Sequence, residues 1–189
     1  MPTGSLADLL TPATPTKGNP KAPILIVEFS DFTCGYCGKF YRETLPPLTT
    51  QYLNSGKVRF AYRDYPRDED GWGLVAAHAG RCAGEQGQFW EMHNRLFDQG
   101  ARLGKGIMLQ IAKELRLKID PFTKCMDSQK HIEAILADRD MAVKLGFHGT
   151  PGFLVVKTDG RRFSDPTLIP GALPYGRFSA AIDKLIAKR

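Results

Sequence analysis

The sequence has no apolar run approaching the ~18 residues that a membrane-spanning helix needs. Its first ten residues lack a basic start, and they contain no apolar stretch long enough for a secretory signal peptide. We therefore expect no membrane span in this chain. Two possibilities follow for its location: a cytoplasmic protein, or a protein whose signal or anchor is absent from this sequence.

Cysteine is also scarce. The four cysteines, Cys34, Cys37, Cys82 and Cys125, are too few for a small fold held together by disulfides. The net charge of +6 is spread along the chain without a basic stripe interleaved with aromatic residues, so we expect no nucleic-acid binding. With 189 residues, of which 42% are hydrophobic, the chain can bury the core of one domain, or of one domain with a large insertion.

The first third of the chain contains a predicted strand–helix–strand unit. Residues 1–22 are rich in Pro, Thr and Gly and show no period, which favours a flexible leader or linker. Residues 23–29 are apolar and β-branched like a buried strand, a helical pattern covers residues 34–53, and residues 57–63 alternate as a strand does. This order is the βαβ unit of an α/β protein.

The middle of the chain, residues 65–146, shows helical patterns and no strand signal, which favours an all-helical insertion. The patterns cover residues 73–85, 88–98, 107–117, 121–127 and 132–145. A strand at 153–157, a short return strand at 161–164 and an amphipathic helix at 174–188 follow. The predicted fold class is therefore α/β, in the order βαβ…ββα. The predicted α/β domain comprises residues 23–64 and 147–189.

The strongest functional candidate is the C-x-x-C motif formed by Cys34, Gly35, Tyr36 and Cys37, at the turn from the buried strand into the helix. In that position of a βαβ unit, the motif is typical of a thioredoxin-like redox site. The free N–H groups and the dipole of a helix N-terminus stabilise a thiolate, and this lowers the pKa of the first cysteine. We predict that Cys34 is the exposed attacking thiol and that Cys37 resolves the mixed disulfide.

Zinc binding is the alternative for these residue types. A C-x-x-C can be half of a zinc site, completed here by Cys82, Cys125, His78 or His93, although no second C-x-x-C and no H-x₃-H pair is present. His78 and Cys82 are also four residues apart on a predicted helix and form a possible metal pair. Since no third ligand is apparent, we prefer core packing for this pair and expect no metal.

Glu28 and Pro151 are further candidates. Glu28 interrupts the apolar strand six residues before Cys34. A buried carboxyl there would have a raised pKa and could exchange protons with Cys37, while a structural or solvent-facing Glu is the equal alternative. Pro151 precedes a predicted strand, and the sequence alone does not indicate a cis peptide bond, because most X–Pro bonds are trans.

Three segments stand in order around the predicted insertion. They are E-F-S-D-F-T-C-G-Y-C (28–37), A-A-H-A-G-R-C-A-G-E-Q-G-Q-F-W (76–90) and G-F-H-G-T-P-G-F (146–153). Together they resemble the DsbA-like branch of the thioredoxin superfamily, the bacterial disulfide oxidoreductases. The resemblance covers residues 23–188 and implies a thioredoxin-like fold with an inserted helical domain, in which Cys34 is the nucleophile and Cys37 its partner.

The resemblance also implies roles for other residues. Glu28 falls at the family's buried acid, and Pro151 falls at a cis-proline beside the disulfide. Thr150 would offer backbone hydrogen bonds to a substrate strand and tune the thiolate. The remaining candidates for substrate contacts are Gly35, Tyr36 and Phe32, of which we expect Tyr36 and Phe32 to be exposed.

Cys82 and Cys125 each lie on a predicted helix of the insertion. They are either two small buried hydrophobic side chains or a second, structural disulfide. Several members of the family that the chain resembles carry cysteines at these places, so we favour the disulfide. Such a bond would indicate an oxidising compartment.

The motif departs from that of the family's strongest oxidants, which have Pro-His where this chain has Gly35-Tyr36. We therefore expect a less oxidising couple. C-G-Y-C followed by Thr-Pro also resembles the disulfide isomerase DsbC, but the short leader cannot supply the N-terminal domain of that protein.

The predicted activity is that of a disulfide oxidase, which needs no cofactor and acts on protein or peptide thiols and disulfides. Isomerase or reductase activity is one alternative, because redox potential sets the direction of exchange. A non-catalytic peptide-binding chaperone of the same fold is another. The resemblance implies a membrane quinone-linked partner for reoxidation, and a location in the bacterial periplasm or cell envelope.

Overall fold

The structure is a computed structural model that describes residues 3–188, apart from the side chain of Ala101. It divides into two compact units, and the chain passes between them several times. Unit 1 contains the described parts of Met1–Phe29, Lys39–Arg63 and Pro151–Arg189, and unit 2 contains Ser30–Gly38 and Asp64–Thr150. The C-x-x-C segment therefore clusters with the helical unit, whereas the sequence analysis assigned it to the α/β domain.

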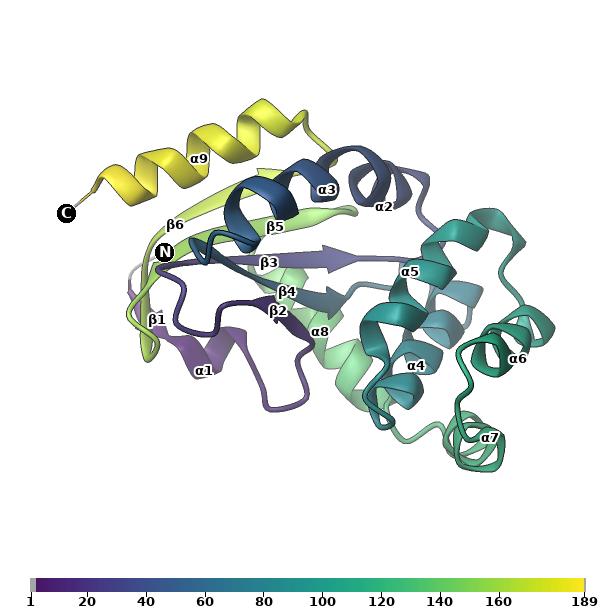
Figure 1. Ribbon diagram of the computed structural model, residues 1–189. Helices are drawn as coiled ribbons and strands as arrows, with labels where there is room; N and C mark the ends of the chain where they lie inside the picture. The colour runs from purple at the N-terminus through teal and green to yellow at the C-terminus, as the bar shows by residue number, and fades with distance from the viewer. Residues whose placement is uncertain (1–2, 189) are drawn as a thin grey trace. The chain divides into compact units, whose positions relative to one another are not determined.

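Among the described residues, unit 1 is built on a six-stranded sheet with the strand order β1-β6-β5-β3-β4-β2 (Figure 1). The strands are β1 (Gly4–Ser5), β2 (Thr16–Gly18), β3 (Ile24–Ser30), β4 (Val58–Asp64), β5 (Gly152–Thr158) and β6 (Arg162–Pro170). β3 and β5 lie at the centre and pair antiparallel, with Glu28 opposite Phe153. β3 is buried along its whole length, as its apolar sequence predicts.

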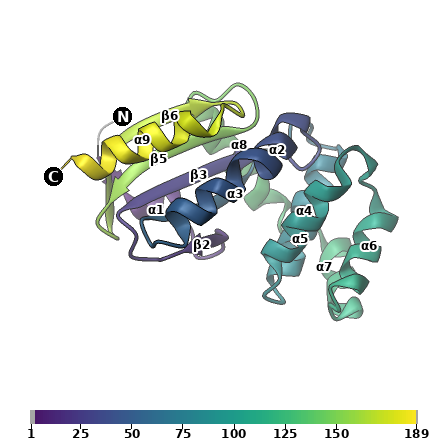
Figure 2. The same cartoon turned by 45° about the horizontal axis from the view of Figure 1, so that its top comes forward.

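The helices of unit 1 cover both faces of this sheet. They are α1 (Leu6–Leu9), η1 (Phe40–Thr44), α3 (Leu45–Leu48), η2 (Thr49–Leu53) and α9 (Tyr175–Ala187). α3 and α9 lie side by side over one face, and α1 lies on the other (Figures 1 and 2). Buried aromatic rings join sheet and helices, with centroids 4.4 Å apart for Phe40–Phe153 and 4.8 Å apart for Phe153–Phe178.

The helical stretch expected over residues 34–53 is present but interrupted. α2 (Gly35–Lys39) continues into the π-helical turn η1, where the Leu45 N–H bonds to the Phe40 carbonyl five residues earlier. The two prolines after Leu45 then occupy the first positions of α3. Proline lacks an N–H and clashes with the preceding turn of a regular helix, so it is best tolerated at such a start.

The flexible leader expected for residues 1–22 is wrong for its described part, while its first two residues lie outside that part. β1 pairs with β6, and β2 pairs with β4. α1 begins with a capping box, in which Ser5 caps the first turn and the Asp8 carboxylate accepts the Ser5 N–H at 3.1 Å. Gly18 has a φ of +89°, and a Cβ there would lie 2.6 Å from the Val58 carbonyl oxygen, so this close strand pairing requires glycine.

Unit 2 is helical, as predicted for residues 65–146. Its helices besides α2 are α4 (Trp72–Gly84), α5 (Phe89–Gln99), the 3₁₀ turn η3 (Gly100–Arg102), α6 (Lys105–Glu114), α7 (Ile119–Ser128) and α8 (Ile132–Lys144). Every predicted helix is found, with ends that differ by at most three residues. Among residues 3–188, no helix combines the length and the apolar character needed to cross a lipid bilayer.

A buried ion triad ties three segments of unit 2 together. Arg81 on α4 donates hydrogen bonds of 2.7 Å to Asp64 and of 2.7 Å to Asp138. All three side chains are at most 10% exposed. A single guanidinium therefore compensates two buried carboxylates.

Replacing Arg81 with leucine should lower the free energy of unfolding by about 3–5 kcal/mol, because it leaves two buried carboxylates without their shared counter-charge. Urea denaturation of the oxidised protein measures this loss. Lys105→Leu is the matched control, since it removes an exposed ion pair to Asp127 that should contribute at most about 1 kcal/mol. Equal effects of the two substitutions would contradict the structural role of the triad.

Candidate active site

The C-x-x-C motif starts a helix, as the sequence predicts. Cys34 directly precedes α2, and its carbonyl accepts a hydrogen bond of 3.0 Å from the Gly38 N–H. Cys37 lies inside the first turns of α2 and is fully buried, whereas Cys34 is 7% exposed. Both are free cysteines. Cys34 is thus the more accessible thiol of the pair, although it is far less exposed than we expected.

The surroundings of Cys34 favour its thiolate form. They lower the pKa of the thiol from its ordinary value of 9.0 to about 5. The largest cause is a hydrogen bond with the Cys37 side chain; burial acts in the opposite direction. The Thr150 side chain and the backbone N–H groups of Cys37 and Tyr36 lower the pKa further. The free N–H groups at the start of α2 therefore act on the sulfur as the sequence analysis predicted.

Thr150 reaches Cys34 from a distant part of the chain. The Cys34 Sγ donates a hydrogen bond of 3.5 Å to the Thr150 carbonyl, across a separation of 116 residues. Pro151 follows and is buried, and its carbonyl accepts a hydrogen bond of 2.7 Å from the Gly171 N–H. The Thr150 carbonyl is therefore in contact with the Cys34 sulfur, while the roles that the resemblance implies for Thr150 and Pro151 toward a substrate stay predictions.

Asp31 organises the turn before Cys34, and the sequence analysis missed it. One carboxylate oxygen accepts hydrogen bonds from the Thr33 N–H at 2.7 Å and from the Thr33 hydroxyl at 2.6 Å. The other accepts from the Arg67 N–H at 2.8 Å, while the Asp31 carbonyl accepts from the Cys34 N–H at 3.0 Å. The available signal was an Asp two residues before a Thr at a helix start, which is typical of an Asx turn.

Glu28 is buried in β3, with 1% exposure. Its negative charge raises the pKa of Lys17, although burial outweighs this effect and leaves the pKa of Lys17 below its usual value. The burial that we expected for Glu28 is therefore present. Its role as a proton carrier for Cys37 remains a prediction.

The exposed aromatic residues differ from the expected ones. Tyr36 is 67% exposed and Gly35 is also on the surface, so both are accessible to a substrate. The prediction that Phe32 is exposed and contacts a substrate is wrong: it is 1% exposed and packs against Phe97, with ring centroids 4.8 Å apart. Trp72, 49% exposed, is an accessible aromatic residue of unit 2 that the sequence analysis did not single out.

The second pair of cysteines forms the disulfide that we favoured. Cys82 on α4 and Cys125 on α7 are bonded, with their Cα atoms 5.8 Å apart. His78 lies one turn before Cys82, and burial lowers the pKa of its imidazole to about 4, with His131 acting in the same direction. The ring is therefore neutral at pH 7.

The structure brings Cys125 close to His78 and Cys82 as a potential third metal ligand. The potential ligand atoms of His78, Cys82 and Cys125 lie within 4.8 Å of one another, and so do those of Glu85, Cys125 and His131. Neither of these clusters, the ones found among the described residues, includes Cys34 or Cys37. While the disulfide persists, its two sulfur atoms are bonded to each other and do not act as metal ligands.

Removing this disulfide should destabilise the protein. The bond closes a loop with a sequence separation of 43, for which loop-closure entropy predicts about 4 kcal/mol. We expect Cys82→Ala/Cys125→Ala to lower the free energy of unfolding by about that amount in urea, compared with the parent at the same redox state of Cys34 and Cys37. A loss below about 1 kcal/mol would show that the bond adds little to the fold.

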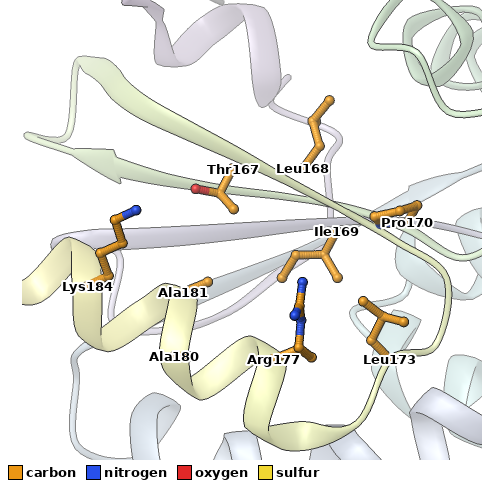
Figure 3. A pocket seen from close by; sticks show the side chains of 9 residues that line it. All are labelled: Thr167, Leu168, Ile169, Pro170, Leu173, Arg177, Ala180, Ala181 and Lys184. Carbon is orange, nitrogen blue, oxygen red and sulfur yellow. The ribbon is translucent and has the colours of Figure 1, made fainter.

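An apolar groove of about 260 Å³ lies between β6 and α9 in unit 1 (Figure 3). Its floor includes Ile169 and Leu173, and Arg177 and Lys184 stand along α9. The groove contains no cysteine, histidine or carboxylate among its lining residues. It therefore offers no group for redox chemistry, and we assign no catalytic role to it.

Comparison with known proteins agrees with this geometry. The model of the thioredoxin family matches residues 10–184. A probable disulfide bond formation protein D of Bacillus anthracis is 31% identical over 150 residues, which cover 73% of this chain and 67% of that protein. The Na(+)/H(+) antiporter NhaA 3 of Salinispora tropica is 32% identical over 166 residues, 85% of this chain, but the chain spans only 24% of the antiporter.

Solved structures resemble the whole chain. The crystal structure of alpha-DsbA1 from Wolbachia pipientis has a TM-score of 0.84 and 28% identity, and the match covers 96% of each chain. The chain belongs to the thioredoxin family and, within it, to the DsbA-like proteins. The thioredoxin-like fold with an inserted helical domain is thereby confirmed.

Proposed function

We propose that this chain is a thiol–disulfide oxidoreductase of DsbA type that works as a disulfide oxidase on protein or peptide thiols. The observation that carries the proposal is the pairing of a low-pKa Cys34 with the buried Cys37 at the start of α2. A stabilised thiolate favours the reduced form of the pair, and this makes the disulfide form the stronger oxidant.

The proposed reaction passes through a mixed disulfide. A substrate thiolate attacks Cys34 Sγ of the oxidised pair, so that a bond to Cys34 forms and the Cys34–Cys37 bond breaks. Cys37 leaves with the electron pair and takes up a proton, for which Glu28 is the proposed source. A second substrate thiolate then attacks the substrate sulfur, and Cys34 leaves as a thiolate. Two electrons have passed from the substrate to the enzyme.

The substrate would lie across the exposed side of the motif. We assign the backbone of Thr150 and the following Pro151 to contacts with a substrate strand, because the Thr150 carbonyl already contacts the Cys34 sulfur. Gly35 and Tyr36 supply the accessible surface next to it. The low exposure of Cys34 limits attack to thiolates that approach over these residues.

The proposal also includes the cell compartment of the protein and the partner that reoxidises it. The Cys82–Cys125 disulfide suits an oxidising compartment, and we place the protein in the bacterial periplasm or cell envelope. An oxidase must be reoxidised after each cycle, and a membrane quinone-linked protein is the proposed acceptor of the two electrons.

Single-turnover exchange tests the direction of the reaction. The oxidised chain is mixed with a reduced peptide that has two cysteines, and alkylation followed by mass measurement counts the thiols on both molecules. An oxidase gives peptide disulfide and reduced Cys34 and Cys37. The isomerase or reductase alternative, favoured by Gly35-Tyr36 in place of Pro-His, predicts instead that the reduced chain transfers electrons to a disulfide peptide. A chaperone gives neither reaction.

A further inference from the structure

The Cys82–Cys125 disulfide is surrounded by groups that bind metal ions. His78 lies one turn before Cys82 on α4, Glu85 caps the end of the same helix, and His131 caps the start of α8. The Cys125 Sγ is 3.8 Å from a carboxylate oxygen of Glu85. Five potential ligands from three helices thus meet around one disulfide.

His78 contributes a ring nitrogen to this cluster, and its hydrogen bonding is incomplete. Its side chain is 2% exposed, and its Nε2 has no hydrogen-bond partner among the described residues. A buried polar atom without a partner costs free energy, so such an atom in a native fold calls for an explanation. A metal ion bound by the imidazole would supply the missing interaction.

We propose that reduction of the Cys82–Cys125 disulfide converts this cluster into a zinc site, in which His78, Cys82, Cys125 and Glu85 bind one Zn²⁺. A dithiol or a phosphine supplies the two electrons that break the S–S bond and gives two thiols. Zinc binding then displaces the two thiol protons. Two thiolates, an imidazole and a carboxylate are ligands that zinc accepts in a closed tetrahedral site.

Three of the four proposed ligands already lie close together. Two thiolates on a tetrahedral Zn²⁺ lie about 3.7 Å apart, so the two sulfur atoms must separate from bonding distance by rotation of their side chains. The ligand atoms of His78, Cys82 and Cys125 already lie within 4.8 Å of one another. Both cysteines lie on helices, α4 and α7, that the structure holds side by side.

Glu85, the proposed fourth ligand, is held in position by neighbouring side chains. The His131 Nε2 lies 2.6 Å from a Glu85 oxygen, and the Lys130 ammonium lies 2.8 Å from the same oxygen. Outer partners of this kind orient a ligating carboxylate. The two thiolates and one carboxylate give the zinc complex a net charge of −1, which Lys130 balances.

The test uses the full chain with Cys34→Ser/Cys37→Ser, so that the C-x-x-C motif cannot bind the metal. The oxidised and phosphine-reduced proteins are titrated with Zn²⁺ against a chromogenic chelator. We expect one equivalent of tightly bound zinc in the reduced protein and none in the oxidised protein. Co²⁺ in place of zinc should give the thiolate charge-transfer absorbance of a site with two cysteine ligands.

Three variants locate the site. His78→Gln and Glu85→Gln should each weaken zinc binding at least about tenfold. His148→Gln, an exposed histidine outside the cluster, should leave it unchanged. The proposal is overturned if reduced and oxidised proteins bind zinc equally, if His78→Gln binds as the parent does, or if the reduced chain unfolds by circular dichroism and zinc does not restore the fold.

Discussion

Replacing Cys34 with serine should reduce disulfide exchange to the uncatalysed background, a loss of about a thousandfold or more. Cys34 is the only one of the two active-site cysteines with any exposure, and its low pKa makes it the better leaving group at the end of the cycle. Single-turnover oxidation of a reduced two-cysteine peptide measures this loss. Cys82→Ala/Cys125→Ala is the control and should keep the parent's rate.

The Cys37→Ser variant separates the attacking role of Cys34 from the resolving role of Cys37. With no resolving thiol, the Cys34 thiolate of this variant should attack a single-cysteine peptide supplied as its disulfide-linked dimer. One peptide leaves as the thiol, and the other stays bonded to Cys34 as a mixed disulfide that is visible as a covalent adduct in the mass spectrum. The Cys34→Ser variant should form far less adduct, because Cys37 is fully buried. Equal adduct formation by the two variants would show that the assignment of attacking and resolving thiols is wrong.

The Cys34 thiolate should persist down to a pH of about 5 in the reduced protein, since the pKa of Cys34 is lowered to about 5. Thiolate absorbance in the far ultraviolet, followed against pH, measures this directly. The oxidised protein is the blank, because its cysteines carry no thiolate. A midpoint close to the ordinary thiol value would contradict the stabilisation that the proposed oxidase needs.

The same shift makes the stability of the reduced protein depend on pH. The folded pKa of Cys34 lies below the ordinary value of 9.0 that the thiol has in the unfolded chain, so ionisation stabilises the folded reduced protein fully above that value. The stabilisation, up to about 5 kcal/mol, is lost as the pH falls toward 5 and is absent below it. Buried His78, whose pKa is lowered to about 4, makes both forms lose stability as the pH falls, so urea denaturation of the reduced and oxidised forms should show the Cys34 dependence as the difference between them.

Two substitutions of Thr150 test whether its side chain contributes to the low pKa of Cys34. Thr150→Val removes the side-chain hydroxyl that contributes to the low pKa of Cys34, so the midpoint of the thiolate titration should move upward. Thr150→Ser keeps a hydroxyl and should move it less. An unchanged midpoint in Thr150→Val would mean that the side chain of Thr150 does not act on the sulfur.

Local patterns predicted most of the architecture. The apolar run that became β3 and the five helical patterns of residues 65–146 are visible because burial imposes a period on a continuous segment. The C-x-x-C was assigned from its place between strand and helix, and α2 begins directly after Cys34. Each of these features depends on residues that are close in sequence.

Features that depend on distant residues were harder to predict. The strands β1 and β2 are only two and three residues long and are held by their partners β6 and β4. Strands this short show almost no alternation of apolar and polar residues in the sequence. A local signal did exist in the capping box of Ser5 and Asp8. Arg63, whose guanidinium donates a hydrogen bond of 2.7 Å to the Leu9 carbonyl, anchors this segment in a way that only the fold reveals.

Around the active site too, the predictions failed where a feature depends on residues that are far apart in the sequence. Phe32 stands two residues before Cys34, yet it is buried against Phe97 of α5, because burial follows from tertiary packing and not from distance along the chain. The contact between Cys34 and Thr150 spans 116 residues and was expected only through the family resemblance. The sequence analysis found no third ligand beside His78 and Cys82 for the same reason, since Cys125 approaches them from a different helix, α7.

The reduction potential of the Cys34–Cys37 pair tests the central claim most directly. The protein is equilibrated with mixtures of reduced and oxidised glutathione, alkylated, and counted by mass. The account predicts a reversible two-electron couple near or above about −180 mV, as for a disulfide catalyst of an oxidising compartment. A couple near about −270 mV would make the protein a reductase and contradict the proposed direction, and the absence of any reversible couple would contradict the redox centre itself.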